Sequence, residues 1–190
     1  MTVPRWAVAS AIAAPVALIG GWRLAAARQP SFDPARQTIS ALAATTATEP
    51  WIMTTGLAVT GAAHVMTAAG LRPVPAPARV LHAVGGTAML AVAVLPNDVH
   101  RRAHRVAAGI GFGALAVWPA LAGRRGATGV LAPAATVGAS AALVGTLGWF
   151  VRELQGDSDA TGLSERVLAG AEALWPLVVV VALRRARSSG

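Results

Sequence analysis

The sequence predicts an all-α integral membrane protein, a bundle of six transmembrane helices with a partly helical outer loop between spans 1 and 2. Of the 190 residues, 55% are hydrophobic and only 13% are charged, whereas soluble domains have roughly 25% charged residues. Several apolar runs approach the length of about 20 residues that crosses a hydrocarbon core. The sixteen basic residues are all arginine and stand at the ends of these runs. We therefore treat residues 1–190 as a single membrane domain.

The charge and the cysteine content exclude several other classes of protein. A net charge of +8 and a pI near 11.9 would fit a nucleic-acid-binding protein. The arginines flank apolar runs, however, as residues at membrane boundaries do, so we expect no nucleic acid partner. The chain has no cysteine, which excludes disulfides, thiol catalysis and cysteine-ligated metals.

The first span is expected at about residues 6–24. Arg5 and the apolar stretch that follows it imitate a secretory signal. This stretch is longer than the usual signal core of about 7–15 residues, and Arg23 interrupts the cleavage region that a signal would need. We expect a retained helix with a kink at Pro15, which neighbouring helices in a bundle can tolerate.

The long connection after this span, residues 25–50, has a pattern of its own. Asp33 precedes a proline, which is typical of a turn. Residues 35–44 then predict a short helix whose apolar face is formed by Ile39, Leu42 and Ala43, three residues at helical spacing. This helix is expected to lie on the membrane surface or to cap the bundle, with Asp33 as its N-cap.

Five more apolar runs predict spans at about residues 51–71, 79–95, 103–122, 130–151 and 164–183. A stiff proline-rich connector, residues 73–78, separates the second and third spans. Small residues let membrane helices approach one another closely. We expect this role for the spaced glycines inside the spans, namely Gly85, Gly86, Gly109, Gly111, Gly113, Gly138 and Gly145.

An even number of spans places both termini on one side of the membrane. The two sides carry eight arginines each, so the arginine count does not choose between them. On the side of the termini, the arginines occupy short turns without acids, whereas the other side includes the long loop. This difference favours cytoplasmic termini in a multi-pass protein of a bacterial inner (cytoplasmic) cell membrane.

Glu172 is the most informative residue for function, because it is an acid inside the sixth span. It lies roughly 12 Å below the outer boundary, at 1.5 Å per helical residue. A carboxylate at that depth must be protonated, paired or exposed to a cavity. Arg23, His104 and Arg105 are candidate partners at a comparable depth, and a functional and a structural role are equally open.

The histidines offer little support for a bound cofactor or metal. A bis-histidine haem needs two imidazoles at matched depth, but the expected spans leave His64 and His82 about 6 Å apart in depth. His100 and His104 have the spacing of a helical metal pair, although neighbouring arginines would repel a cation. We therefore expect His100 and His104 to be solvated at the interface, with no cofactor and no metal. His64 and Trp175 are further candidate residues of a ligand or proton site.

Polar residues also gather in the long loop, where Asp33, Arg36, Thr38 and Ser40 follow one another. They are expected to form a turn, or alternatively part of an outward-facing pocket above Glu172. Since no serine has a histidine–acid setting visible in the sequence, we expect no catalytic residue.

Three motifs resemble those of the bacterial family known as domain of unknown function 998. They are Phe32-Asp33-Pro34-x-Arg36-Gln37-Thr38-Ile39-Ser40-x-Leu42-Ala43, the segment from His104 to Gly109, and Glu172-x-x-Trp175-Pro176. The span that contains His64 is similar as well. The resemblance covers nearly the whole chain and implies a six-helix integral membrane protein, without an activity, substrate or cofactor.

The sequence thus predicts a non-catalytic membrane protein that contacts membrane lipid. We expect it to bind a lipid, a small hydrophobic molecule or a partner membrane protein in an outward-facing cavity near Glu172. The alternative is a small transporter or membrane enzyme in which Glu172 handles protons.

Overall fold

The computed structural model describes residues 2–156 and 158–188, with the side chains of Arg187 and Ser188 left out. Asp157, in the connection between the predicted fifth and sixth spans, lies outside this part. The described residues form helices and turns only. Six helices are long and apolar enough to cross a membrane, which confirms the predicted fold class. They are α1 (Arg5–Ala26), α2 (Trp51–Gly70), α3 (Ala76–Val94), α4 (Arg101–Ala122), α5 (Pro133–Gln155) and α6 (Thr161–Ser188).

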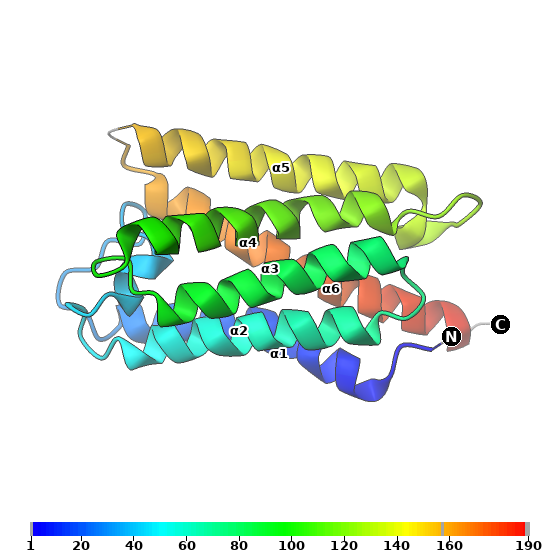
Figure 1. Ribbon diagram of the computed structural model, residues 1–190, viewed down its shortest axis with the longest axis horizontal. Helices are drawn as coiled ribbons and strands as arrows, with labels where there is room; N and C mark the ends of the chain where they lie inside the picture. Colours follow the sequence, from blue (N-terminus) through cyan, green and yellow to red (C-terminus); the bar gives the residue numbers. More distant parts are fainter. Residues whose placement is uncertain (1, 157, 189–190) are drawn as a thin grey trace.

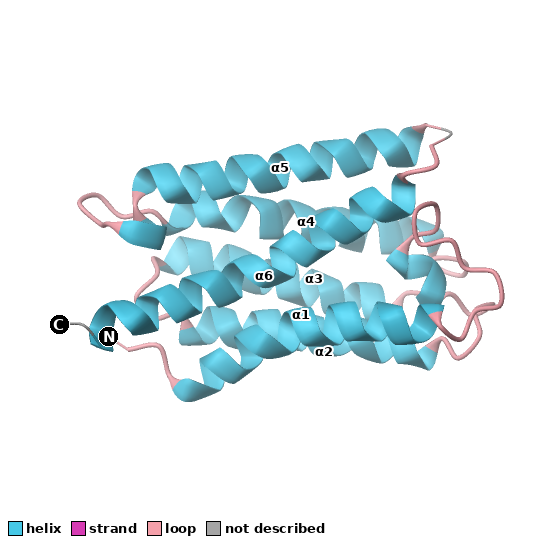
Figure 2. Ribbon diagram, turned by 180° about the vertical axis from the view of Figure 1, so that it is seen from behind, coloured by secondary structure: helices cyan, strands magenta, loops and turns pink. Residues whose placement is uncertain are grey.

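The helices alternate in direction, and each packs against the next in the chain, while α6 returns to pack against α1 (Figure 1). Figure 2 shows α6 crossing the bundle obliquely from one end to the other. The long connection between α1 and α2 and the α3–α4 and α5–α6 turns share one end, which we call the loop end. Both chain termini lie at the other end, the terminal end.

Several helix boundaries differ from the predicted spans for local reasons. The helix α3 begins at Ala76, three residues earlier than expected, because Pro77 falls in its first turn, where a missing N–H costs no hydrogen bond. A 3₁₀ turn, η2 (Gly129–Leu131), precedes α5, which starts with Pro133. The helix α6 extends beyond its predicted span at both ends.

The predicted short helix in the long connection is the 3₁₀ helix η1 (Ile39–Ala43), and Ile39, Leu42 and Ala43 are its buried residues, as expected. Its N-cap is Thr38, whose hydroxyl accepts a hydrogen bond from the Ala41 amide. The prediction of Asp33 as the cap was therefore wrong. The Asp33 carboxylate accepts from the Ala35 amide at 2.8 Å and closes the turn before η1 instead.

Close backbone contact fixes the packing of α2 against α3. A Cβ added to Gly86 would lie 2.7 Å from the Gly61 carbonyl oxygen, and one added to Gly61 would lie 2.7 Å from the Gly86 oxygen. Small residues thus bring these helices together, as expected for Gly86. The same expectation was wrong for the glycines that have no neighbour within 4 Å of an added Cβ, which are Gly109, Gly113, Gly138 and Gly145.

Candidate functional site

The long connection is hydrogen-bonded to the first turns of α6, 126 to 132 residues later in the chain. The Leu163 amide donates to the Ala35 carbonyl at 2.9 Å. A Cβ on Gly162 would collide with the Gln37 and Pro34 carbonyl oxygens, so only glycine fits beneath the loop. This contact brings η1 over the interior of the bundle at the loop end.

Arg166 is the main side chain that holds the loop in place. Its Nη1 atom donates to the carbonyl oxygens of Pro34 at 2.7 Å and Gln37 at 2.8 Å. Its guanidinium carbon lies 4.8 Å from the ring centroid of Trp22 and 5.2 Å from that of Phe32. A cation between two aromatic rings is attracted by both of them. The aromatic residue of the loop motif thus serves to dock the loop.

Asp33 and Arg36, two predicted site residues, lie on the exposed outer side of this loop. Arg36 is 3.6 Å from Asp33 and 2.9 Å from Asp159. Exposed ion pairs of this kind contribute little to stability. The structure therefore places both residues in a surface ion-pair network and away from the interior.

Glu165, one residue before Arg166, points to the interior instead. Its side chain is buried, and its carboxylate accepts a hydrogen bond from the Ile39 amide, with the Ser40 amide also facing it. This contact joins α6 to η1 across 126 residues of sequence. Glu165 was not among the predicted site residues, although its position seven residues before Glu172 places both acids on one helix face.

His104 forms a second link between η1 and the helices. Its Nδ1 atom is 2.7 Å from the Leu95 carbonyl oxygen, and its Nε2 atom is 3.1 Å from the Ser40 hydroxyl oxygen. Both ring nitrogens are thus engaged. This arrangement contradicts the expectation of a solvated interfacial histidine, and it leaves His104 unable to pair with His100, which is exposed.

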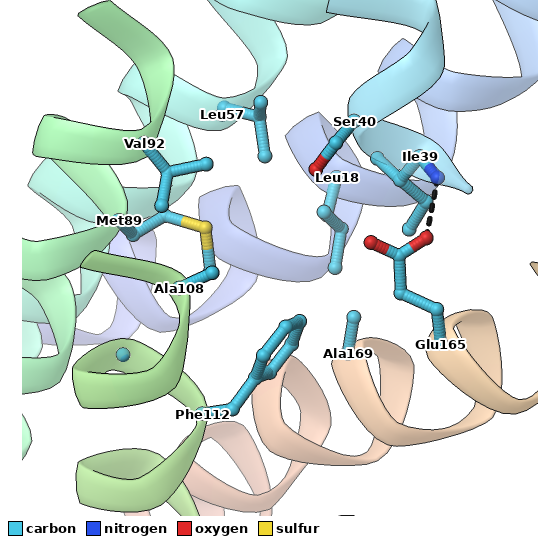
Figure 3. A pocket seen from close by; sticks show the side chains of 11 residues that line it. Leu18, Ile39, Ser40, Leu57, Met89, Val92, Ala108, Phe112, Glu165 and Ala169 are labelled. Atoms are coloured by element: carbon cyan, nitrogen blue, oxygen red, sulfur yellow. Dashed lines mark hydrogen bonds between the residues drawn. The ribbon is translucent and has the colours of Figure 1, made fainter. Parts of the chain in front are cut away.

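Ser40 and Glu165 line a cavity beneath η1 (Figure 3). Its volume is about 30 Å³, and about 10–15 Å³ accommodates one water molecule. The other walls are apolar and come from α1, η1, α2, α3, α4 and α6, namely Leu18, Ile39, Leu57, Met89, Val92, Ala108, Gly111, Phe112 and Ala169. The cavity therefore combines a polar side, formed by a hydroxyl and a carboxylate, with apolar walls.

Glu172 does not line this cavity. It is buried, with 1% of its surface exposed, and neither carboxyl oxygen has a hydrogen-bond partner. Of the expected partners, Arg23 and Arg105 are exposed and His104 is bonded elsewhere, so the predicted pairing is not formed. Trp175, one turn further along α6, is half-buried, and its indole N–H also lacks a partner.

His64 and His82 meet near the terminal end, where Nδ1 of His64 is 3.0 Å from Nε2 of His82. The ring of His82 stacks on Trp118 with centroids 4.6 Å apart. The predicted depth difference was wrong because α3 starts early. His64 lies 70 − 64 = 6 residues from the end of α2, and His82 lies 82 − 76 = 6 residues from the start of α3. Their direct contact leaves no space for a haem iron between the rings.

Hydrogen bonds also connect the remaining turns at the loop end. The Thr45 hydroxyl donates to the Asp98 carboxylate at 2.5 Å, and this hydrogen bond holds the pKa of Asp98 below its usual value. The Gln29 side chain donates to the Thr48 carbonyl at 2.8 Å. Among the described residues, no group of three or more histidine, cysteine or acidic side chains is arranged to hold a metal ion.

The six apolar helices define a multi-pass membrane protein, with a small cavity enclosed by a docked loop. The sequence model of the family described as "Protein of unknown function (DUF998)" matches residues 11–182. The chain belongs to this family, which confirms the resemblance. No curated protein and no solved structure matches the chain.

Proposed function

We propose that this protein binds a slender apolar molecule, the acyl chain of a lipid, in the cavity beneath η1. The supporting observation is the character of the cavity walls, which are apolar except for Ser40 and Glu165 on one side. Ligand sites are commonly apolar, with a few polar groups that fix the orientation of the ligand. Here the Ser40 hydroxyl would contact the carboxyl or ester end of the chain.

The size of the cavity limits the ligand. About 30 Å³ is far below the roughly 300–1,000 Å³ of sites for drug-sized molecules, so the resident ligand must be narrow and the walls must adapt. Met89 is one of the wall residues, and methionine side chains readily adopt new shapes. We expect Met89 to move when the chain enters.

We expect the lipid chain to enter from the bilayer through the pair of helices α3 and α4, from the face opposite the cavity. A groove of about 900 Å³ runs between α3 and α4, with Arg102 among its lining residues at the loop end. Small residues of these two helices line both hollows: Ala88, Ala91 and Ala107 face the groove, and Ala108 and Gly111 face the cavity. A lipid chain would cross between α3 and α4 where these small residues meet.

The test uses a photoreactive fatty acid with protein reconstituted in liposomes, and cross-linked peptides are mapped by mass spectrometry. We expect cross-links on cavity residues such as Phe112. Ala108→Leu fills the cavity and should reduce this labelling several-fold. Ala142→Leu, at an exposed position of α5, is the matched control and should leave it unchanged. Labelling that is spread over exposed positions and insensitive to Ala108→Leu would contradict the proposal.

A second candidate function is proton handling by Glu172, supported by its buried carboxyl group without a partner. Acids inside membranes are costly and commonly belong to ion or proton pathways. Proton flux into liposomes that contain a pH-sensitive dye tests this. Glu172→Gln should abolish flux, whereas Glu49→Gln in the exposed loop should not. Equal flux in wild type and Glu172→Gln would eliminate the proton role.

A further inference from the structure

We propose that Ser40 is a nucleophile activated by His104, and that it attacks an acyl ester whose chain occupies the cavity. This step rests on the proposed binding function and adds a reaction to it. The Ser40 hydroxyl oxygen lies 3.1 Å from Nε2 of His104, within reach for proton transfer. The two residues are 64 positions apart in the sequence, so the pair becomes visible only in the folded chain.

The orientation of the imidazole supports the role of a base. A carbonyl oxygen can only accept, so the contact of 2.7 Å between Nδ1 of His104 and the Leu95 oxygen requires a proton on Nδ1. In the neutral ring, Nε2 then carries the lone pair and accepts from the Ser40 hydroxyl. Nucleophile, base and an orienting third group are the three parts of an activated serine.

The surroundings place this pair where a substrate could reach it. Ser40 is only half-buried, and Figure 3 shows its hydroxyl oxygen pointing into the cavity, on the same side as the Glu165 carboxylate. Apolar walls lie opposite, formed by residues such as Met89 and Phe112. An ester with its chain against these walls would present its carbonyl group to Ser40.

The reaction is hydrolysis with water as the only co-reactant. Ser40 Oγ forms a bond to the carbonyl carbon while its proton moves to Nε2 of His104. The ester C–O bond then breaks, and His104 gives this proton to the departing alcohol. Water attacks the acyl-serine, passes a proton to His104 and releases the fatty acid. His104 finally gives the proton that it took from water to Ser40 Oγ.

The lack of free backbone amides beside Ser40 limits the rate of the proposed hydrolysis. The backbone amides beside the nucleophile, those of Ile39 and Ser40, face the Glu165 carboxylate and are not free to stabilise an oxyanion. Loss of one such donor slows serine enzymes by about 10²–10³. We therefore expect slow acylation and slow deacylation, so irreversible trapping of the nucleophile is a more sensitive experiment than a turnover assay.

The experiment is to trap the adduct with a fluorophosphonate that carries a hexadecyl chain, using the full-length protein in liposomes. Attack by Ser40 on phosphorus forms a P–O bond and expels fluoride, and mass spectrometry locates the adduct. Wild type and Ser31→Ala, a change in an exposed serine of the same loop, should be labelled on Ser40. His104→Gln can keep hydrogen bonds to Leu95 and Ser40 but is no base, and it should slow labelling by about 10²–10⁴.

Absence of a Ser40 adduct in folded wild-type protein would overturn the proposal, as would equal labelling rates in wild type and His104→Gln. The adduct site is read from the wild-type protein, so the test does not depend on whether Ser40→Ala folds. The fatty acid cross-linking experiment separates the two proposals. Normal cavity cross-links without a Ser40 adduct would leave binding intact and reject the nucleophile.

Discussion

Glu165 and Glu172 lie on the same inward side of α6, two helical turns or about 10 Å apart along the axis, but only one of them is hydrogen-bonded. Their residues are 4% and 1% exposed. The Glu165 carboxylate holds the Ile39 amide, whereas both oxygens of Glu172 lack a partner. Glu165 therefore docks the loop, whereas Glu172, in the same helix, has no structural partner.

This difference predicts opposite effects of the same substitution. Glu165→Met removes the acceptor of a buried amide and should lower the free energy of unfolding by about 1–3 kcal/mol. Glu172→Met removes an unpaired polar group of similar size and should leave the stability unchanged or raise it. Thermal denaturation in detergent measures both. A loss for Glu172→Met as large as that for Glu165→Met would show that Glu172 has a partner in the membrane.

The docking role of Arg166 predicts that its loss releases the long connection. Arg166→Ala removes hydrogen bonds to the Pro34 and Gln37 carbonyls and the contacts with two rings. Bonds from a charged donor contribute about 1.5–3 kcal/mol each, so for the two bonds we expect a loss of about 3–6 kcal/mol and faster proteolysis within residues 27–50. Arg36→Ala, in an exposed ion pair, is the control and should cost less than about 1 kcal/mol. Equal proteolysis in the two variants would contradict this role.

The sequence was sufficient for the spans and insufficient for the site, for a physical reason. Hydropathy and length determine which segments cross a membrane, and helical spacing alone identified the buried face of η1. Depth along a span says nothing about lateral position, so Arg23 and Arg105 were plausible partners of Glu172 although both are exposed. The pairing of His104 with Ser40 depends on which helices are neighbours, and no local pattern encodes that.

The contact between His64 and His82 predicts energetic coupling between α2 and α3. Their nitrogens are 3.0 Å apart, and both residues are buried. A double-mutant cycle with alanine should give a coupling of about 0.5–1.5 kcal/mol, typical of a buried hydrogen bond. The matched cycle pairs His82 with Ser140, which donates to the Ala116 carbonyl instead, and should be additive. Additivity in the first cycle as well would mean that the histidine contact adds no stability.

The hydrogen bond from Thr45 to Asp98 predicts a pH-dependent contribution to stability. It lowers the pKa of Asp98 in the folded state, so its contribution is complete above the unfolded pKa of about 3.9. It is lost as the pH falls through the lower folded pKa. Thr45→Val should therefore be less stable than wild type near neutral pH, and the difference should disappear in acid. Denaturation at several pH values measures this, with Thr46→Val as the control. A pH-independent difference would assign the effect to packing.

The close approach of α2 and α3 predicts that a single methyl group separates them. In Gly86→Ala the new Cβ would lie 2.7 Å from the Gly61 carbonyl oxygen and 2.9 Å from the backbone nitrogen of Val65. Because these atoms belong to helix backbone, the whole helix must shift, and overpacking of this kind costs about 1–3 kcal/mol. Gly113→Ala is the control, since no atom lies within 4 Å of its added Cβ, and it should stabilise α4 by up to about 1 kcal/mol. Thermal denaturation compares the two.

The variants should also differ at the His64–His82 contact, because His64 Cβ lies 2.9 Å from the new methyl group. The coupling between the two histidines should therefore fall in Gly86→Ala alone.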